Sequence, residues 1–186
     1  KMISHSIRDG IIGAPTIPGD KSISHRSIII PSISNGVCEI DNILKSDDVL
    51  HTINALKALG VKIEEKNNRL IIHGKGLNSL TEPKNTIYLG NSGTSARLLT
   101  GLLSSQQFKS VLAGDSSLSK RPMKRITDPL IKMNAEIFTT NGTLPLTIEG
   151  KKLISNNIDL QIPSAQIKSG LLLASLNTNG ETIITE

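Results

Sequence analysis

The residues best suited to chemistry lie in one short stretch, Pro18-Gly19-Asp20-Lys21-Ser22-Ile23-Ser24-His25-Arg26. After the Pro-Gly turn, Asp20 or Ser22 can cap a helix that begins near Lys21. The free N–H groups and the dipole at a helix N-terminus favour an anion, and Lys21 adds a charge. Ser22 and Arg26 lie four residues apart on one face, where Arg26 can grip two oxygens. The stretch predicts a phosphate or carboxylate site, although a surface helix with two solvated cations fits an isolated pattern of this kind as well.

The elements that must position this site are predicted from apolar periodicity and turn residues. The first unit contains a helix from 21 towards 35, strand 37–43, helix 47–59, and strands 61–65 and 70–73 with a turn at 67–68. The second contains a helix from about 90 to 103, strand 111–113, helix 122–133, and strands 135–139 and 144–148 with a turn at 141–142. The third contains a helix from 164 to 176 and strand 181–185. Pro31 is expected to kink the first helix or end it early.

The order of elements therefore repeats, and this repetition favours an anion site over a solvated surface helix as the interpretation of the first motif. Arg26, Arg97 and Lys168 give a register, since 97 − 26 = 71 and 168 − 97 = 71. In the same frame Ser22 aligns with Gly93 and Ser164. Three helix N-termini in register, each with a small or hydroxylated residue that lets a ligand approach, predict one anion site built from all three.

The repeat also sets the expected domain organisation. Repeat 1 covers about 15–84, repeat 2 about 85–157, and repeat 3, which is incomplete, about 158–186. Short strands predicted at 2–7 and 11–12 precede the first repeat and are assigned to a different domain, covering 1–14. We expect either a longer protein or a second chain to supply the helix and hairpin that the third repeat lacks.

Composition limits the class of partner. Aromatic residues make up 2% of the chain and Trp is absent, so stacking platforms for single-stranded nucleic acid are not expected. The net charge of +5 favours small anions. No apolar run is long enough to span a membrane and the first residues lack a signal-peptide core, so we expect a cytoplasmic protein. No metal or cofactor is expected, because the four histidines show no metal-ligand spacing and Cys38 lies in a predicted strand.

Four motifs together resemble the signatures of the 5-enolpyruvylshikimate-3-phosphate (EPSP) synthase family. They are the stretch 18–26, Leu89-Gly90-Asn91-Ser92-Gly93-Thr94, Lys120-Arg121-Pro122-Met123 and Ser164-Ala165-Gln166. The resemblance covers nearly the whole chain. It implies an α+β fold of α/β-type βαβαββ units around a pseudo-threefold axis, the inverse α/β prism of enolpyruvyl transferases, with most of a second domain absent from this sequence.

The resemblance also implies an activity and its residues. The family transfers the enolpyruvyl group of phosphoenolpyruvate to the 5-hydroxyl of shikimate 3-phosphate and releases phosphate. The residues implied for shikimate 3-phosphate are Lys21, Ser22, Arg26, Ser164, Ala165 and Gln166. Those implied for phosphoenolpyruvate are Lys21, Asn91, Gly93, Thr94, Arg121 and Gln166. The general acid and base are implied to lie in the other domain, so no catalytic residue is assigned, and Arg97 and Lys168 are expected to support helix ends.

Two other functions remain open from the sequence. The sister enzyme that acts on a UDP-amino sugar shares the fold, but it usually depends on a reactive loop cysteine and lacks the K-S-x-x-x-R motif. The second is a binding module without turnover, which we expect of this chain alone because half of the cleft is absent. The whole enzyme is expected to be a monomer.

Overall fold

The computed structural model describes residues 13–186, so the strands predicted at 2–7 and 11–12 lie outside the described residues. The first repeat contains α1 (Lys21–Ser32), β1 (Asn35–Ile40), α2 (Asp47–Ala58), β2 (Lys62–Lys66) and β3 (Arg69–Lys75). The second contains β4 (Ile87–Tyr88), α3 (Gly93–Ser104), β5 (Lys109–Ala113), the 3-10 turn η1 (Leu118–Lys120), α4 (Lys124–Lys132), β6 (Glu136–Thr140) and β7 (Thr143–Glu149). The third contains β8 (Asn157–Asp159), α5 (Ala165–Ser175) and β9 (Ile183–Thr185).

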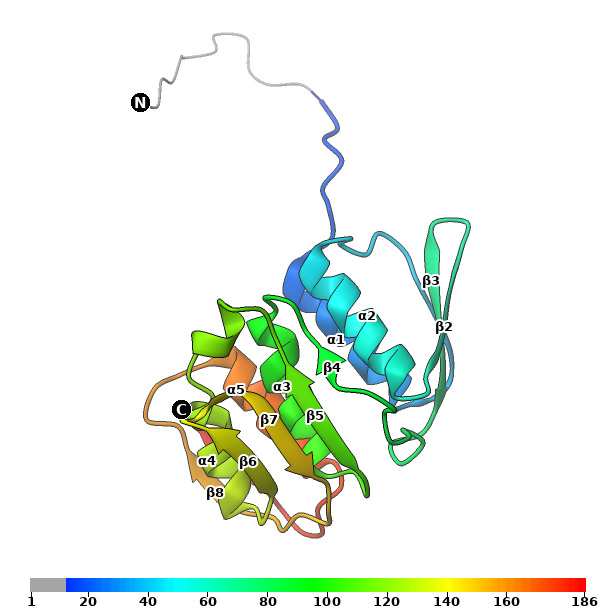
Figure 1. Ribbon diagram of the computed structural model, residues 1–186. Helices are drawn as coiled ribbons and strands as arrows, with labels where there is room; N and C mark the ends of the chain where they lie inside the picture. Colours follow the sequence, from blue (N-terminus) through cyan, green and yellow to red (C-terminus); the bar gives the residue numbers. More distant parts are fainter. Residues whose placement is uncertain (1–12) are drawn as a thin grey trace, which may run out of the picture.

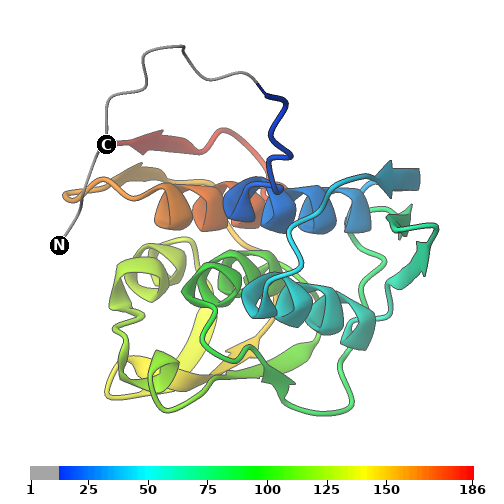
Figure 2. The same cartoon turned by 90° about the horizontal axis from the view of Figure 1, so that it is seen from above.

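The sheets show that the first two repeats share one strand arrangement, with β1-β3-β2 matching β5-β7-β6. In the first sheet the strand order is β1-β3-β2, and in the second it is β4-β5-β7-β6. β3 and β7 each lie between two antiparallel neighbours, whereas β4 pairs with β5, and β8 with β9, in parallel. The three sheets lie on three sides of the helices (Figures 1 and 2). The second repeat thus shows the complete βαβαββ order.

Most predicted elements are present, with differences at their ends. α1 ends at Ser32, one residue after Pro31, which confirms an early end, since proline cannot donate the helical hydrogen bond. The hairpin turns are also confirmed, because Asn67 and Asn68, and Asn141 and Gly142, all have positive φ. The prediction missed β4 and β8, which are only two and three residues long and carry too little periodicity to be recognised.

The helices begin at intervals of 72 residues, not 71 (93 − 21 = 72 and 165 − 93 = 72). The caps match this spacing: an Asp20 carboxylate oxygen accepts from the N–H of Ile23 at 2.7 Å, and Ser92 Oγ accepts from the N–H of Ser95 at 3.2 Å. The register drawn from the three cations is therefore wrong by one residue per repeat. One residue turns a helical side chain by about 100°, so those cations point in different directions.

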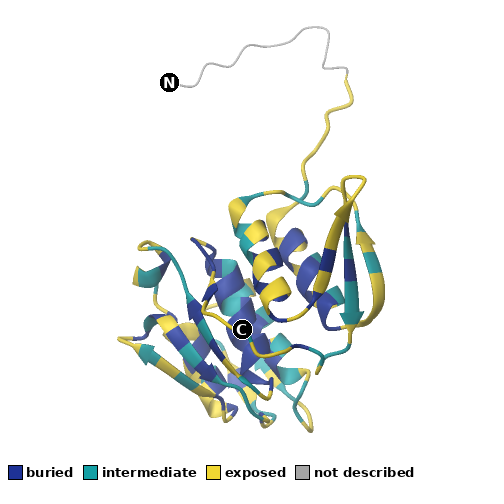
Figure 3. Ribbon diagram, turned by 45° about the vertical axis from the view of Figure 1, so that its right-hand side comes forward, coloured by how far each residue is buried: buried dark blue, intermediate teal, exposed yellow. Residues whose placement is uncertain are grey.

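α3 is the central helix of the core. Ten of its twelve residues are buried, and it packs against α2, α4 and α5. Figure 3 shows buried residues on the helices and, along the strands, buried residues that alternate with more exposed ones. α3 lies close to α5, since a Cβ on Gly101 of α3 would lie 1.9 Å from the carbonyl oxygen of Gly170 on α5. Glycine at both positions lets the helices approach closely and brings their N-termini together.

Candidate anion-binding site

A pocket of about 430 Å³ opens at the N-terminal ends of four helices. Ser22, Thr94 and Gln166 are each the second residue of their helix, and the 72-residue spacing brings these three equivalent positions into one pocket. The lining residues come from α1, α2, α3, α5 and the segments that carry Asn91 and Arg121, and they are Lys21, Ser22, Asp48, Asn91, Gly93, Thr94, Arg97, Arg121 and Gln166.

A hydrogen-bonded chain joins α3 to α5 on one side of the pocket. Gln166 Nε2 donates to Thr94 Oγ1 at 3.0 Å, and Arg97 Nη1 donates to Gln166 Oε1 at 3.3 Å. Arg97 Nη1 also donates to the carbonyl oxygen of Gly93 at 3.0 Å. Arg97 therefore supports a helix end, as expected, but it also lines the pocket, which the sequence analysis did not predict.

Two guanidinium groups converge on Gly93. A Cβ at this position would lie 2.8 Å from Nη1 of Arg97 and 3.0 Å from Nη1 of Arg121. Arg121 is held in place by donating from Nη2 to the side-chain oxygen of Asn91. Because glycine carries no side chain, both guanidinium groups can lie over the first turn of α3, where the helix dipole already favours negative charge.

The charges in the pocket are unbalanced. Burial lowers the pKa of Arg97, and the positive charges of Arg121 and Arg125 lower it further. Among the lining residues the only carboxylate is Asp48, which pairs with Lys21 at 2.8 Å. Three cations face one anion, and a ligand with two negative charges would relieve their repulsion. The pocket is therefore suited to a phosphate or a comparable dianion.

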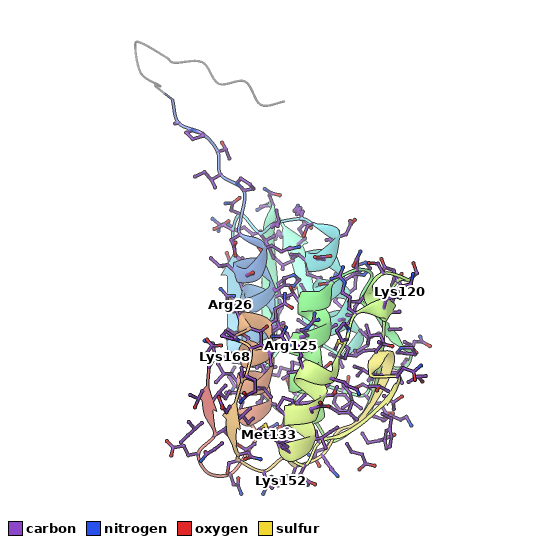
Figure 4. All side chains as sticks on the ribbon, turned by 90° about the vertical axis from the view of Figure 1, so that its left-hand side faces the viewer. Arg26, Lys120, Arg125, Met133, Lys152 and Lys168 are labelled. Carbon is purple, nitrogen blue, oxygen red and sulfur yellow. The ribbon has the colours of Figure 1, made fainter. Side chains whose placement is uncertain are left out.

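Seven of the ten predicted site residues line this pocket, and three do not. Ser164 occupies the N-cap position of α5 and Ala165 is the first residue of that helix. Arg26 is exposed on α1 and borders a separate apolar groove of about 500 Å³ between α1 and α5. Figure 4 shows Arg26 and Lys168 on neighbouring helices. Lys168 forms an ion pair with Glu186.

Asp48 lines the pocket, although nothing in the sequence predicted it there. An acidic residue in the first turn of a helix is common because it interacts favourably with the helix dipole. Neither the type nor the position of Asp48 therefore distinguished it from an ordinary helix-start residue. Only its ion pair with Lys21, 27 positions earlier in the chain, places it in the pocket.

Other kinds of site find little support in residues 13–186. No group of three or more His, Cys, Asp or Glu side chains in this part of the chain could hold a metal ion. Cys38 lies in β1, as predicted, and does not line the basic pocket. None of the described helices combines the length and the apolar character that crossing a membrane requires.

Repeated α/β units whose helix N-termini meet at a basic pocket define a domain of the enolpyruvyl transferase fold. The family model of EPSP synthase (3-phosphoshikimate 1-carboxyvinyltransferase) matches residues 7–186. The chain belongs to the EPSP synthase family.

Individual relatives agree with this assignment. A 3-phosphoshikimate 1-carboxyvinyltransferase of Ruthia magnifica is 49% identical over 96% of this chain, and one of Caldicellulosiruptor bescii is 51% identical over 91%. The solved structure of EPSP synthase from Acinetobacter baumannii superposes with a TM-score of 0.91 at 50% identity over 94% of this chain. This chain spans 41%, 40% and 40% of the length of these three proteins.

Proposed function

We propose that the whole protein transfers the enolpyruvyl group of phosphoenolpyruvate to the 5-hydroxyl of shikimate 3-phosphate and releases phosphate. This chain supplies one half of the substrate cleft. The observation that carries the proposal is the excess of positive charge in a pocket formed by four helix N-termini. Both substrates carry a phosphate and a carboxylate, so their negative charge must be neutralised before they can approach one another.

For phosphoenolpyruvate, all six residues implied by the family resemblance line this one pocket. Arg121 offers a planar guanidinium group to the phosphate. Gly93 and Thr94 offer a helix start with free backbone N–H groups. As the C–O bond to phosphate breaks, negative charge grows on the phosphate oxygens, and fixed donors of this kind stabilise that charge.

For shikimate 3-phosphate, we propose a site across the N-termini of α1 and α5. Lys21, Ser22 and Gln166 reach it from the pocket. Arg26 lies further along α1, Ser164 is the N-cap of α5, and Ala165 is the first residue of that helix. Lys21 and Gln166 then contact both substrates, which places the attacking hydroxyl next to the enolpyruvyl carbon.

The rest of the protein has two roles in this proposal. The family resemblance implies that a second domain supplies the general acid and base. Among the residues that line the pocket, the one carboxylate, Asp48, is already paired with Lys21. Further polypeptide completes the third repeat and packs on the apolar groove between α1 and α5, where Ile30, Leu172 and Leu176 are half-exposed. We also propose that the whole enzyme is a monomer and that it is cytoplasmic.

Arg26→Ala is the first test of the shikimate 3-phosphate site. Loss of a charge-assisted contact costs about 1.5–3 kcal/mol, which corresponds to an affinity roughly 10 to 150 times weaker. Calorimetric titration of the chain with shikimate 3-phosphate measures the difference. Arg69→Ala serves as the control because it removes an arginine that is paired with Glu39 and Asp41 on an exposed sheet.

Equal affinities for the parent chain and Arg26→Ala would contradict the assignment of Arg26. A second assay follows phosphate release after this chain is mixed with the remaining part of the enzyme. Turnover by this chain alone would contradict the proposal that half of the cleft lies elsewhere. The relatives reported above are all named for the shikimate reaction, which favours it over the UDP-amino sugar reaction.

A further inference from the structure

Beneath the pocket, a chain of buried polar side chains connects α1, α2 and α3. His25 Nδ1 on α1 lies 2.8 Å from Thr52 Oγ1 on α2. Thr52 Oγ1 lies 2.6 Å from Ser95 Oγ on α3, which in turn lies 2.6 Å from Oγ of Ser92, the N-cap of that helix. The four side chains are completely buried. We call this set, His25–Thr52–Ser95–Ser92, the relay.

The relay sits directly behind residues that line the pocket. His25 follows Lys21 by one helical turn, and Ser92 lies between Asn91 and Gly93. The carbonyl oxygen of Asp48 lies 3.4 Å from Thr52 Oγ1 and 3.5 Å from Ser95 Oγ. Every helix joined by the relay therefore carries a pocket residue within about one turn of it.

If the hydrogen bonds are donated in the direction from Ser92 to His25, every hydroxyl group of the relay has both a donor and an acceptor. Ser92 Oγ already accepts a hydrogen bond from the N–H of Ser95, so the Ser92 hydroxyl can donate to Ser95 Oγ. Ser95 then donates to Thr52, and Thr52 donates to an unprotonated Nδ1 of His25. Only Nε2 of His25 is left buried without a partner. In this direction of donation, the imidazole of His25 is neutral and carries its proton on Nε2.

We propose that the relay is a positioning device that fixes the N-termini of α1, α2 and α3 relative to one another, and that His25 is its positioning residue. Hydrophobic contacts are not directional, so they hold helices together without fixing their rotation or sliding. Hydrogen bonds in a buried network are directional, and breaking one leaves a polar atom unsatisfied. The relay thereby preorganises the pocket before a ligand arrives. The choice of phosphoenolpyruvate as the ligand in this inference rests on the proposed function, whereas the hydrogen-bonded chain itself is observed in the structure.

Three variants separate positioning from packing. His25→Asn places an amide close to the position of Nδ1 and keeps a partner for Thr52, whereas His25→Leu fills the space without one. Ser95→Ala interrupts the relay at α3 and leaves His25 in place. Titration with phosphoenolpyruvate is expected to show affinity about tenfold weaker for His25→Leu and Ser95→Ala, and within about threefold of the parent chain for His25→Asn.

A second readout does not depend on any ligand. The amide NMR signals of residues 91–95 are expected to shift or broaden in His25→Leu, and those of residues 21–25 in Ser95→Ala. The signals of the β6–β7 hairpin are expected to stay unchanged in both variants. If the parent chain binds neither phosphoenolpyruvate nor inorganic phosphate, the proposed function fails and the amide signals alone decide about the relay. Unchanged signals at residues 21–25 in Ser95→Ala would overturn the inference, even if His25→Leu does not fold.

Acid pH provides a further test of the relay. Burial lowers the pKa of His25; nearby Asp48 raises it and Lys21 lowers it, while the hydroxyl group of Thr52 on α2 contacts the ring. The unfolded chain therefore takes up a proton at a pH where the folded chain does not. Stability is expected to be highest above the ordinary histidine pKa of about 6.5 and to fall as the pH drops from there to the lower folded-state pKa.

Urea unfolding at several pH values measures this loss of stability. His25→Asn has no ionisable group at this position and is expected to lose less stability between pH 7.5 and 5.5 than the parent chain. The affinity for phosphoenolpyruvate of the parent chain, divided by that of His25→Asn, is also expected to change between pH 7.5 and 5.5. Ionisation of the ligand affects both proteins equally and therefore cancels in this ratio. An imidazole of His25 that titrates at its ordinary pKa, followed by NMR, would contradict a relay built on neutral His25.

Discussion

Gly101→Ala is expected to destabilise the protein by about 2–3 kcal/mol, although alanine is intrinsically the better helix former by up to about 1 kcal/mol. The added Cβ would lie 1.9 Å from the backbone carbonyl oxygen of Gly170. A backbone atom cannot rotate away as a side chain does, so α3 and α5 must move apart. That movement weakens the packing of the most buried helix in the described part of the chain.

Thermal unfolding measures this effect. For a chain of this size a loss of 1 kcal/mol lowers the melting temperature by about 2–4 °C, so a decrease of roughly 5–10 °C is expected. Gly13→Ala is the matched control, because no atom lies within 4 Å of the Cβ it would add. If Gly101→Ala melts at or above the temperature of Gly13→Ala, the close contact of the two helices is not as described.

The same substitution is expected to affect the pocket at a distance. Thr94 and Arg97 lie on α3, and both form hydrogen bonds with Gln166 on α5 at 3.0 and 3.3 Å. Separating the helices lengthens these bonds. Gly101→Ala is therefore expected to bind phosphoenolpyruvate more weakly at temperatures where it is still fully folded, although Gly101 does not line the pocket.

Arg121→Ala is expected to weaken phosphoenolpyruvate binding by roughly 10 to 150 times, which corresponds to the loss of one charge-assisted contact of about 1.5–3 kcal/mol. Its guanidinium group lies over the start of α3 and is oriented by Asn91. Arg121→Lys is expected to be intermediate, because an ammonium group keeps the charge but cannot bind two oxygens in a plane. Calorimetric titration of the three proteins gives the comparison.

Lys120→Ala is the control for this experiment. Lys120 is adjacent in the sequence and exposed, and it lies outside the pocket; Figure 4 shows it at the edge of the molecule on η1. Both alanine variants remove one positive charge from nearly the same place, so long-range attraction is equally reduced. If the two variants weaken binding to the same extent, Arg121 acts only through long-range charge and does not contact the ligand.

Local motifs were sufficient to predict much of this site. The residues implied for phosphoenolpyruvate come from four short stretches, and all six line one pocket. The resemblance to the family supplied their expected roles, while helix caps, glycines and basic residues indicated where the helices begin. The hairpin turns at 67–68 and 141–142 were also predicted from local residue types, since asparagine and glycine tolerate positive φ.

Rotational register was harder to predict. The three cations spaced by 71 residues suggested equivalent positions, yet the helices begin every 72 residues. As a result Arg97 lies in the pocket, Arg26 borders the apolar groove and Lys168 pairs with Glu186. A shift of one residue is invisible in a coarse repeat but turns each side chain by about 100°.

By itself, the sequence determined the repeated order of helix, strand, helix, strand and strand, the basic residues at helix N-termini, and the family, because short-range patterns encode all three. Only the tertiary structure decided that Asp48 pairs with Lys21, that Arg97 lines the pocket, and that His25 connects with the start of α3 through Thr52 and Ser95. These contacts join residues on different helices. They depend on how closely the helices pack and how each is rotated, which in turn depend on the whole core.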